Sequence, residues 1–314
     1  MTDMRKVAFL FAGQGAQTVG MGRDFADTVP ESGAVFSMGE ALRTGITQIC
    51  FGTGSPMDGA LLGQTANTQP CLFLTDLAIA EAFRAVGLLP AAVAGFSLGE
   101  IPAAAFAGVL SYEEAFRFVL LRAESMAWQS GRHPGGMAAA LKLAPEVVEE
   151  ICSRFSEVWP VNYNCPGQVS CAGSAAEIDD FCAAVRQAGG RAVKLPVSGA
   201  FHTPYMAQVA PVLRAALDGA DVSAPAIPLY ANRTASPYPA DRAGILDCMT
   251  LQVCSPVRWE STLRAMWTAG ITTFVEVGAG HTLTGFVSRT LPEARALTVW
   301  EIPAFHPLSP HRAE

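Results

Sequence analysis

Charged residues are scarce in this 314-residue sequence, where Asp, Glu, Lys and Arg together make up 16%. The 21 basic residues are outnumbered by 28 acidic ones, which gives a formal net charge of −7, and the basic residues form no cluster. Binding of nucleic acid depends on clustered Lys and Arg that neutralise phosphates. The composition therefore argues against a nucleic-acid partner.

Long apolar runs are also missing, although 50% of the residues are hydrophobic. The first run, at 7–12, ends at Gly13, and later ones such as 101–110 contain proline or glycine. A secretory signal needs a longer apolar core, and a helix that spans a bilayer needs roughly 20 apolar residues. We therefore expect a cytoplasmic protein without a membrane segment.

The 8 cysteines form no CxxC pair and lie mostly in apolar segments. Zinc sites and disulfide frameworks need closer, patterned spacing. Reduced and buried thiols in a cytosolic protein are therefore the expected state. The sequence offers no site for a metal ion or a redox cofactor.

Apolar runs, glycine turns and helical patterns alternate along the chain, which is typical of an α/β protein. Three segments predict strands of a buried parallel sheet: the continuous apolar run 7–11, the short apolar segment 91–95, and 273–277, which ends at Gly278. Helices are predicted at 68–86, at 100–107 and from the N-cap Ser111 to about Gln129. The tail after Pro303 is expected to be loosely held.

The pattern changes near Gly131. Strand and helix signals then follow in the order β-α-β-β-α-β, at 135–141, 144–155, 159–164, 168–172, 174–188 and 192–195. This order in a short segment is the signature of a ferredoxin-like split βαβ unit. We predict a large α/β domain, formed by 1–130 and 201–314, that is interrupted by a small α+β insert at 131–200.

Residues 95–99 match GxSxG, the pattern of a nucleophile elbow. The tight turn from strand to helix needs small residues around the serine, and it exposes Ser97 at the start of a helix. There the helix dipole and the Leu98 amide can stabilise an oxyanion. The alternative is a serine that only caps a helix, but the apolar run before it and the small residues after it favour the elbow.

A serine nucleophile needs a base, and the chain has 5 histidines. His202 lies at 197–204, between the insert and the returning large domain, where a substrate cleft is expected. His281 follows a glycine turn and can serve as a helix cap. The others lie in a loop or in the proline-rich tail: His133, His306 and His311. His202 is therefore the first candidate and His281 the second.

Several motifs fall in order along nearly the whole chain: 13–17 (GQGAQ), 95–100 (GFSLGE), Arg122, 199–202 (GAFH), and Gln252 with Pro256 and Val257. On these residues the sequence resembles the malonyl-CoA:acyl-carrier-protein transacylase family of fatty-acid and polyketide synthesis. The resemblance implies an α/β-hydrolase-like large subdomain with a ferredoxin-like insert. It also implies transfer of malonyl from malonyl-CoA to an acyl carrier protein through a malonyl-serine, without a cofactor. We expect a monomer.

The resemblance also implies roles for single residues in the reaction. Ser97 would be the nucleophile and His202 the base that activates it. The backbone amides of Gln14 and Leu98 would form the oxyanion hole. The backbone carbonyl of Gln252 would orient the histidine.

Arg122 resembles the arginine that binds the malonyl carboxylate, and a planar guanidinium can do so with two parallel hydrogen bonds. It lies in an apolar stretch, 118–123, where its charge needs an anionic partner from the protein or a ligand. Phe96 stands where many members have a histidine that lines the acyl pocket. The segment 199–202 (GAFH), which includes Phe201, resembles the motif found at this place in family members that select malonyl groups.

Three other functions are compatible with parts of this pattern. An ordinary esterase would place an acidic residue between Ser97 and His202, but the aspartates there, Asp179 and Asp180, begin an amphipathic helix and complement its dipole. An acyl-thioester hydrolase of the same fold would not need Arg122. A non-catalytic carrier-protein docking module would be expected to have lost the serine, the histidine or the arginine.

Overall fold

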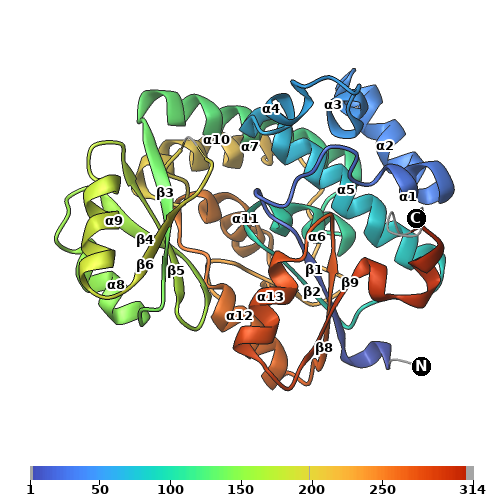
Figure 1. The fold of residues 1–314 in the computed structure, drawn as a ribbon. Helices are drawn as coiled ribbons and strands as arrows, with labels where there is room; N and C mark the ends of the chain where they lie inside the picture. The colour runs from blue at the N-terminus through green and yellow to red at the C-terminus, as the bar shows by residue number, and fades with distance from the viewer. Residues whose placement is uncertain (1–2, 198, 309–314) are drawn as a thin grey trace.

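The computed structural model describes residues 3–197 and 199–308. Its parallel strands are β1 (Val7–Phe11), β2 (Ala92–Gly95), β7 (Leu229–Tyr230), β8 (Thr273–Val277) and β9 (Arg295–Thr298). They form one sheet in the order β7-β2-β1-β8-β9. The antiparallel strands are β3 (Gly135–Leu141), β4 (Val158–Cys165), β5 (Gln168–Ser174) and β6 (Arg191–Lys194). They form a second sheet in the order β4-β5-β3-β6, which lies to the left in Figure 1.

The central strands of the parallel sheet are buried on both faces, and every residue of β1 and β8 is buried. Alternation of side chains along β1 sends Phe9 and Leu10 to opposite faces. The Phe9 ring lies 4.7 Å from that of Phe83, between centroids, whereas Leu10 belongs to the cluster that contains Trp259. The predicted strands 7–11 and 273–277 coincide with β1 and β8. β1 is continuously apolar, as expected of a strand buried on both faces, whereas β8 also carries the buried Glu276.

Helices cover the parallel sheet in the larger part of the molecule (Figure 1). They are α1 (Arg23–Thr28), α2 (Pro30–Leu42), α3 (Ile46–Phe51), α4 (Asp58–Leu62), α5 (Thr65–Ala85), α6 (Glu100–Phe106), α7 (Tyr112–Arg132), α10 (Val209–Ala216), α11 (Arg242–Leu251), α12 (Trp259–Thr268) and α13 (Thr282–Thr290). The predicted cap of α7 is present, since Ser111 and Glu114 form a capping box. The helix ends at Arg132 rather than near Gln129.

The antiparallel sheet carries α8 (Pro145–Cys152) and α9 (Ile178–Gln187) on one face. Its elements follow in the predicted β-α-β-β-α-β order. Along β3, Ala138 and Ala140 pack beneath these helices, whereas the alternate residues Met137 and Ala139 line a cavity between the two sheets. One face of the sheet therefore forms a core of its own, and the other contributes to a site.

The segment after Pro303 is ordered as far as Leu308, so the prediction of a loose tail is wrong there. It forms a short 3-10 turn, and Phe305 is buried. The Phe305 ring lies 4.6 Å from Phe83 and 5.4 Å from Phe25, between centroids. Proline-rich composition did not reveal this anchor, and His311 lies outside the described residues. Among the helices of the described residues, none is long and apolar enough to cross a membrane.

Candidate active site

Ser97 lies at a sharp turn between β2 and α6, with a backbone φ of 54°. Left-handed backbone is strained for serine and persists only where the surroundings enforce it. The flanking residues must be glycines because a larger side chain would collide with nearby backbone. A Cβ atom on Gly95 would lie 1.9 Å from the carbonyl carbon of Gly99, and one on Gly99 would lie 2.2 Å from the oxygen of Phe11. The turn therefore has room for no other residue at either position.

Gly95→Ala should lower the free energy of unfolding by about 3 kcal/mol or more, at the upper end of the cost of overpacking. The new methyl group would meet rigid backbone rather than a movable side chain. Gly59→Ala is the matched control, because a Cβ atom there meets nothing within 4 Å and the residue lies in a helix. Urea unfolding measures both variants, and equal midpoints would contradict the steric account of the turn.

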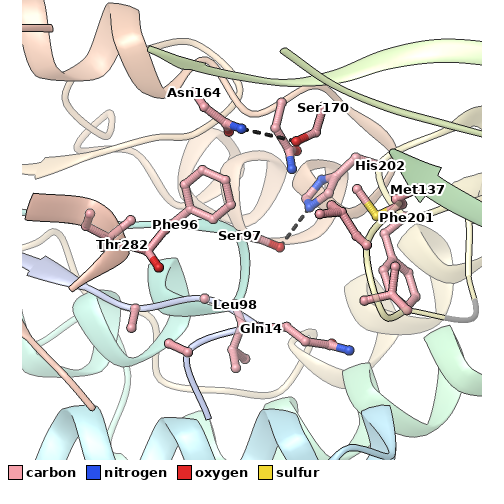
Figure 2. A pocket seen from close by; sticks show the side chains of 18 of the residues that line it. Gln14, Phe96, Ser97, Leu98, Met137, Asn164, Ser170, Phe201, His202 and Thr282 are labelled. Atoms are coloured by element: carbon pink, nitrogen blue, oxygen red, sulfur yellow. Dashed lines mark hydrogen bonds between the residues drawn. The ribbon is translucent and has the colours of Figure 1, made fainter. Parts of the chain in front are cut away.

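His202 is hydrogen-bonded to Ser97, with 2.7 Å between Nε2 and Oγ (Figure 2). Its Nδ1 lies 2.8 Å from the carbonyl oxygen of Gln252 and 3.1 Å from that of Ser255. Because carbonyl oxygens only accept, Nδ1 must carry the proton and Nε2 presents its lone pair to the hydroxyl. In the described part of the chain the ring has no carboxylate partner.

The imidazole of His202 is buried, with 4% of the residue exposed. Burial, together with the positive charge of Arg122, lowers its pKa from 6.5 to about 4. The ring is therefore neutral at neutral pH, which is the state that a general base requires. The two carbonyl oxygens that accept from Nδ1 partly oppose this shift.

Arg122 is held in α7 with only 1% of its surface exposed. Its Nη1 donates to Gln69 Oε1 at 2.7 Å, and its Nη2 donates to Gln252 Oε1 at 2.9 Å. Nη2 also lies 3.5 Å from Ser97 Oγ. The ion pairs found among the described residues do not include this guanidinium. Burial lowers the pKa of Arg122 to about 10, so the group stays charged beside the serine.

Gln14 and Leu98 lie on the same side of Ser97 in Figure 2, and both line the cavity. The side chain of Gln14 donates to Thr65 Oγ1 at 3.2 Å. Gly13 allows the two loops to approach, because a Cβ atom there would lie 2.5 Å from the oxygen of Phe96. The first glycine turn and the elbow therefore meet backbone to backbone, as an oxyanion hole of two amides requires.

The cavity has a volume of about 290 Å³ and is lined by residues of both sheets. Phe96 and Phe201 lie on its wall, on opposite sides of Ser97 in the view of Figure 2. The Phe96 ring packs edge-on against Trp259, with centroids 5.4 Å apart. On the wall formed by the antiparallel sheet, Asn164 donates to Ser170 Oγ at 3.1 Å.

The second candidate base, His281, is not at this site. It is exposed and occupies the N-cap position of α13. His133 follows α7 and stacks on Tyr205, with ring centroids 4.9 Å apart. Of the histidines in the described residues, the structure brings His202 to Ser97.

Two polar residues of the site have no counterpart in the sequence-based predictions. Asn232 accepts the Ser97 backbone N–H at 2.7 Å through Oδ1 and donates to the oxygen of Gly95 at 2.5 Å through Nδ2. Gln69 binds Arg122 from α5. A buried amide within the apolar stretch of α5 is the one local signal that could have indicated Gln69. Asn232 lies in a loop that has no such signal.

A serine hydroxyl bonded to a neutral imidazole at a strand-to-helix turn is the arrangement of enzymes that form covalent acyl-serine intermediates. Comparison with known families agrees with this class. The acyl transferase domain model matches residues 8–307, and the chain belongs to this family.

Individual relatives cover nearly the whole chain. It is 34% identical over 302 residues, 94% of each protein, to the malonyl CoA-acyl carrier protein transacylase of Bacillus subtilis (strain 168). An acyl carrier protein S-malonyltransferase from Vibrio cholerae has a similar fold, with a TM-score of 0.88 and 32% identity, covering 97% of this chain and 100% of that one. A malonyl-transacylase solved in complex with a type II PKS acyl-carrier protein gives a TM-score of 0.90 at 29% identity, covering 96% of this chain and 98% of that one.

Proposed function

We propose that this protein transfers the malonyl group of malonyl-CoA to the phosphopantetheine thiol of an acyl carrier protein, through a malonyl ester of Ser97. One observation carries the choice of acyl group. The buried guanidinium of Arg122 is held by two neutral amides and lies 3.5 Å from the serine oxygen. An acyl group with a free carboxylate supplies an anion for this charge, which forms no ion pair among the described residues. The names of the relatives support the same reaction.

The proposal includes the architecture implied by the family resemblance. The segments 1–130 and 201–314 would form an α/β-hydrolase-like subdomain, and 131–200 a ferredoxin-like one. The strand order β4-β5-β3-β6 with two helices on one face supports the second description. We also propose a cytoplasmic monomer that needs no metal ion or redox cofactor, since acyl transfer between thioesters requires neither.

In the first half-reaction His202 Nε2 takes the proton from Ser97 Oγ, which attacks the thioester carbon. The backbone amides of Gln14 and Leu98 stabilise the oxyanion. When the carbon–sulfur bond breaks, the imidazolium returns the proton to the sulfur, so CoA leaves as a thiol. The carbonyl oxygen of Gln252 holds the ring in place while its charge changes.

In the second half-reaction the carrier's phosphopantetheine thiol enters the same cavity. His202 takes the thiol proton, and the sulfur attacks the ester carbon. The bond to Ser97 Oγ then breaks and the oxygen recovers its proton from the ring, so the free enzyme is restored. Contact of the malonyl carboxylate with Arg122 would orient the ester in both half-reactions.

The proposal is tested by the intact mass of a holo acyl carrier protein after incubation with this protein and one thioester. Malonyl-CoA should add one malonyl group to the carrier, and acetyl-CoA and methylmalonyl-CoA should compete poorly. The apo carrier, which has no thiol, is the control. Release of free malonate without a carrier adduct would instead indicate the thioester hydrolase, and no reaction of any kind would indicate the docking module.

Arg122→Ala should reduce acylation by malonyl-CoA tens- to thousands-fold, because truncating one member of a buried charge pair costs roughly 2–5 kcal/mol. Acylation by acetyl-CoA should fall little, since acetyl has no carboxylate to bind. Arg117→Ala is the matched control, an exposed arginine on the same helix. Rapid-quench mass spectrometry measures the rates of the wild type and both variants with each thioester. Equal losses for the two thioesters would mean that Arg122 is only structural.

The pH dependence of acylation should follow the lowered pKa of His202. The neutral imidazole is the active form, so kcat/KM for malonyl-CoA should stay level between about pH 6 and pH 8. It should decrease towards about tenfold per unit once the pH falls below the pKa of about 4. A profile that already declines near pH 6.5, the ordinary histidine value, would contradict the burial of a neutral ring.

A further inference from the structure

Glu100 is a fully buried carboxyl group next to the nucleophile elbow, at the first residue of α6. An acidic residue in the first helical turn ordinarily complements the helix dipole. The side chain of Glu100 has a further role, because it is hydrogen-bonded to residues of distant segments of the chain. Burial raises its pKa to about 8, which the donors around it and the charge of Arg122 oppose.

Its two oxygens have different partners. Oε1 accepts from the Tyr238 hydroxyl at 2.6 Å and from the backbone N–H of Asn232 at 3.4 Å. Oε2 accepts from Gln252 Nε2 at 3.2 Å. All of these partners come from elements more than a hundred residues away in the sequence. Glu100 therefore connects the elbow to the segment that follows α11.

Gln252 contacts four residues of the site, three through its side-chain amide and one through its backbone carbonyl. Nε2 donates to the Ser97 carbonyl oxygen at 3.1 Å as well as to Glu100. Oε1 accepts from Arg122 at 2.9 Å, and the backbone oxygen binds His202. An amide turned by 180° would present its N–H groups to the guanidinium, donor against donor. The orientation of this amide therefore decides whether Arg122 has its acceptor.

We propose that Glu100 is a positioning residue for the malonyl carboxylate, which acts by holding the Gln252 amide with its oxygen towards Arg122. Two acceptors, the carbonyl of Ser97 and the carboxyl oxygen of Glu100, both require Nε2 on their side. Loss of the Glu100 acceptor leaves the Ser97 carbonyl as the only one of the two that holds Nε2. The amide then rotates more readily, and Arg122 loses its alignment beside Ser97 whenever it does. This inference rests on the proposed function. It identifies Glu100 as a further residue that determines the preference for an acyl group with a free carboxylate.

The test separates alignment of Arg122 from reactivity of Ser97. Malonyl-CoA reports both, whereas methanesulfonyl fluoride, a small neutral reagent, modifies the serine without a carboxylate contact. Glu100→Leu fills the space of the side chain with apolar groups and removes the acceptor. It should slow acylation by malonyl-CoA about ten- to hundredfold, the effect of losing the hydrogen bond between the Gln252 oxygen and the charged Arg122. It should slow sulfonylation by less than about threefold.

Two further variants distinguish this role from a structural one. Glu100→Gln can still present an oxygen to Gln252 and should restore malonyl acylation to within about threefold of the wild-type rate. Tyr238→Phe removes a hydrogen bond from the same carboxyl group but leaves the Gln252 contact, so it should not change the ratio of the two rates. If Glu100→Leu does not fold, Glu100→Ala replaces it, and circular dichroism verifies the fold of each variant.

Equal slowing of both reactions in Glu100→Leu, or no slowing of either, would overturn the positioning role while leaving the proposed function intact. Failure of Glu100→Gln to recover the malonyl rate would also overturn it, because the amide oxygen supplies the contact on which the argument depends. If the wild-type protein reacted with the sulfonyl fluoride but never with malonyl-CoA, the proposed function itself would be wrong, and this inference would fall with it.

Discussion

Ser97→Ala should abolish the malonyl adduct on the protein and reduce malonyl transfer to a carrier by about 10⁴-fold or more. The loss is this large because the hydroxyl that the substitution removes is the group hydrogen-bonded to the His202 base at the cavity. The alanine methyl replaces a hydroxyl that the fold does not need for packing. Intact-mass measurement after mixing with malonyl-CoA detects the adduct, and thermal unfolding verifies that the fold is retained.

The matched control for this substitution is Ser37→Ala, which removes an exposed hydroxyl from α2. It should leave both the adduct and the transfer rate unchanged. Peptide mapping then locates the malonyl group in the wild-type protein. An adduct on any residue other than Ser97, or an alanine variant that still acquires one malonyl mass, would refute the elbow assignment.

His202→Ala should slow acylation by about two to four powers of ten, which is the usual contribution of a positioned general base. Without the ring, the Ser97 hydroxyl must lose its proton to water, which is a much weaker base than a neutral imidazole. His202 has a backbone φ of 63°, a conformation that alanine adopts with strain and asparagine tolerates. His202→Asn therefore serves as a second variant that removes the base with less disturbance of the backbone.

His281→Ala is the matched control, since that histidine is exposed at the start of α13. Its acylation rate should stay within about twofold of the wild-type rate, as expected for a surface substitution. Quenched-flow measurements of malonyl-enzyme formation compare the three variants. A large loss in the His281 variant together with a small one in the His202 variants would reverse the assignment of the base.

Local physics made the elbow predictable from sequence. Gly95 and Gly99 are needed because backbone atoms lie within 2.2 Å of where a Cβ would be. The two glycines are only four residues apart, so this requirement is visible as a short sequence motif. The same holds for β1, whose burial on both faces gives a continuous apolar run. The capping box at Ser111 and Glu114 is likewise a contact between near neighbours.

Contacts between distant segments left no such pattern. Asn232 holds the Ser97 amide across 135 residues, and Gln252 meets Arg122 across 130. The charge of Arg122 indicated that a partner was needed, but nothing local showed that the protein supplies neutral amides rather than a carboxylate. Short elements were equally hard to detect, since β7 has only 2 residues and is defined by its pairing with β2.

The most direct test of the account follows the malonyl group through one complete cycle. The malonyl-enzyme is prepared with malonyl-CoA, freed of CoA by rapid gel filtration, and mixed with holo acyl carrier protein in a single turnover. The account predicts that the mass of one malonyl group leaves Ser97 and appears on the carrier thiol, at a rate well above the loss of the ester to water. An ester that the carrier thiol does not accelerate, and that decays to malonate with or without it, would contradict transfer.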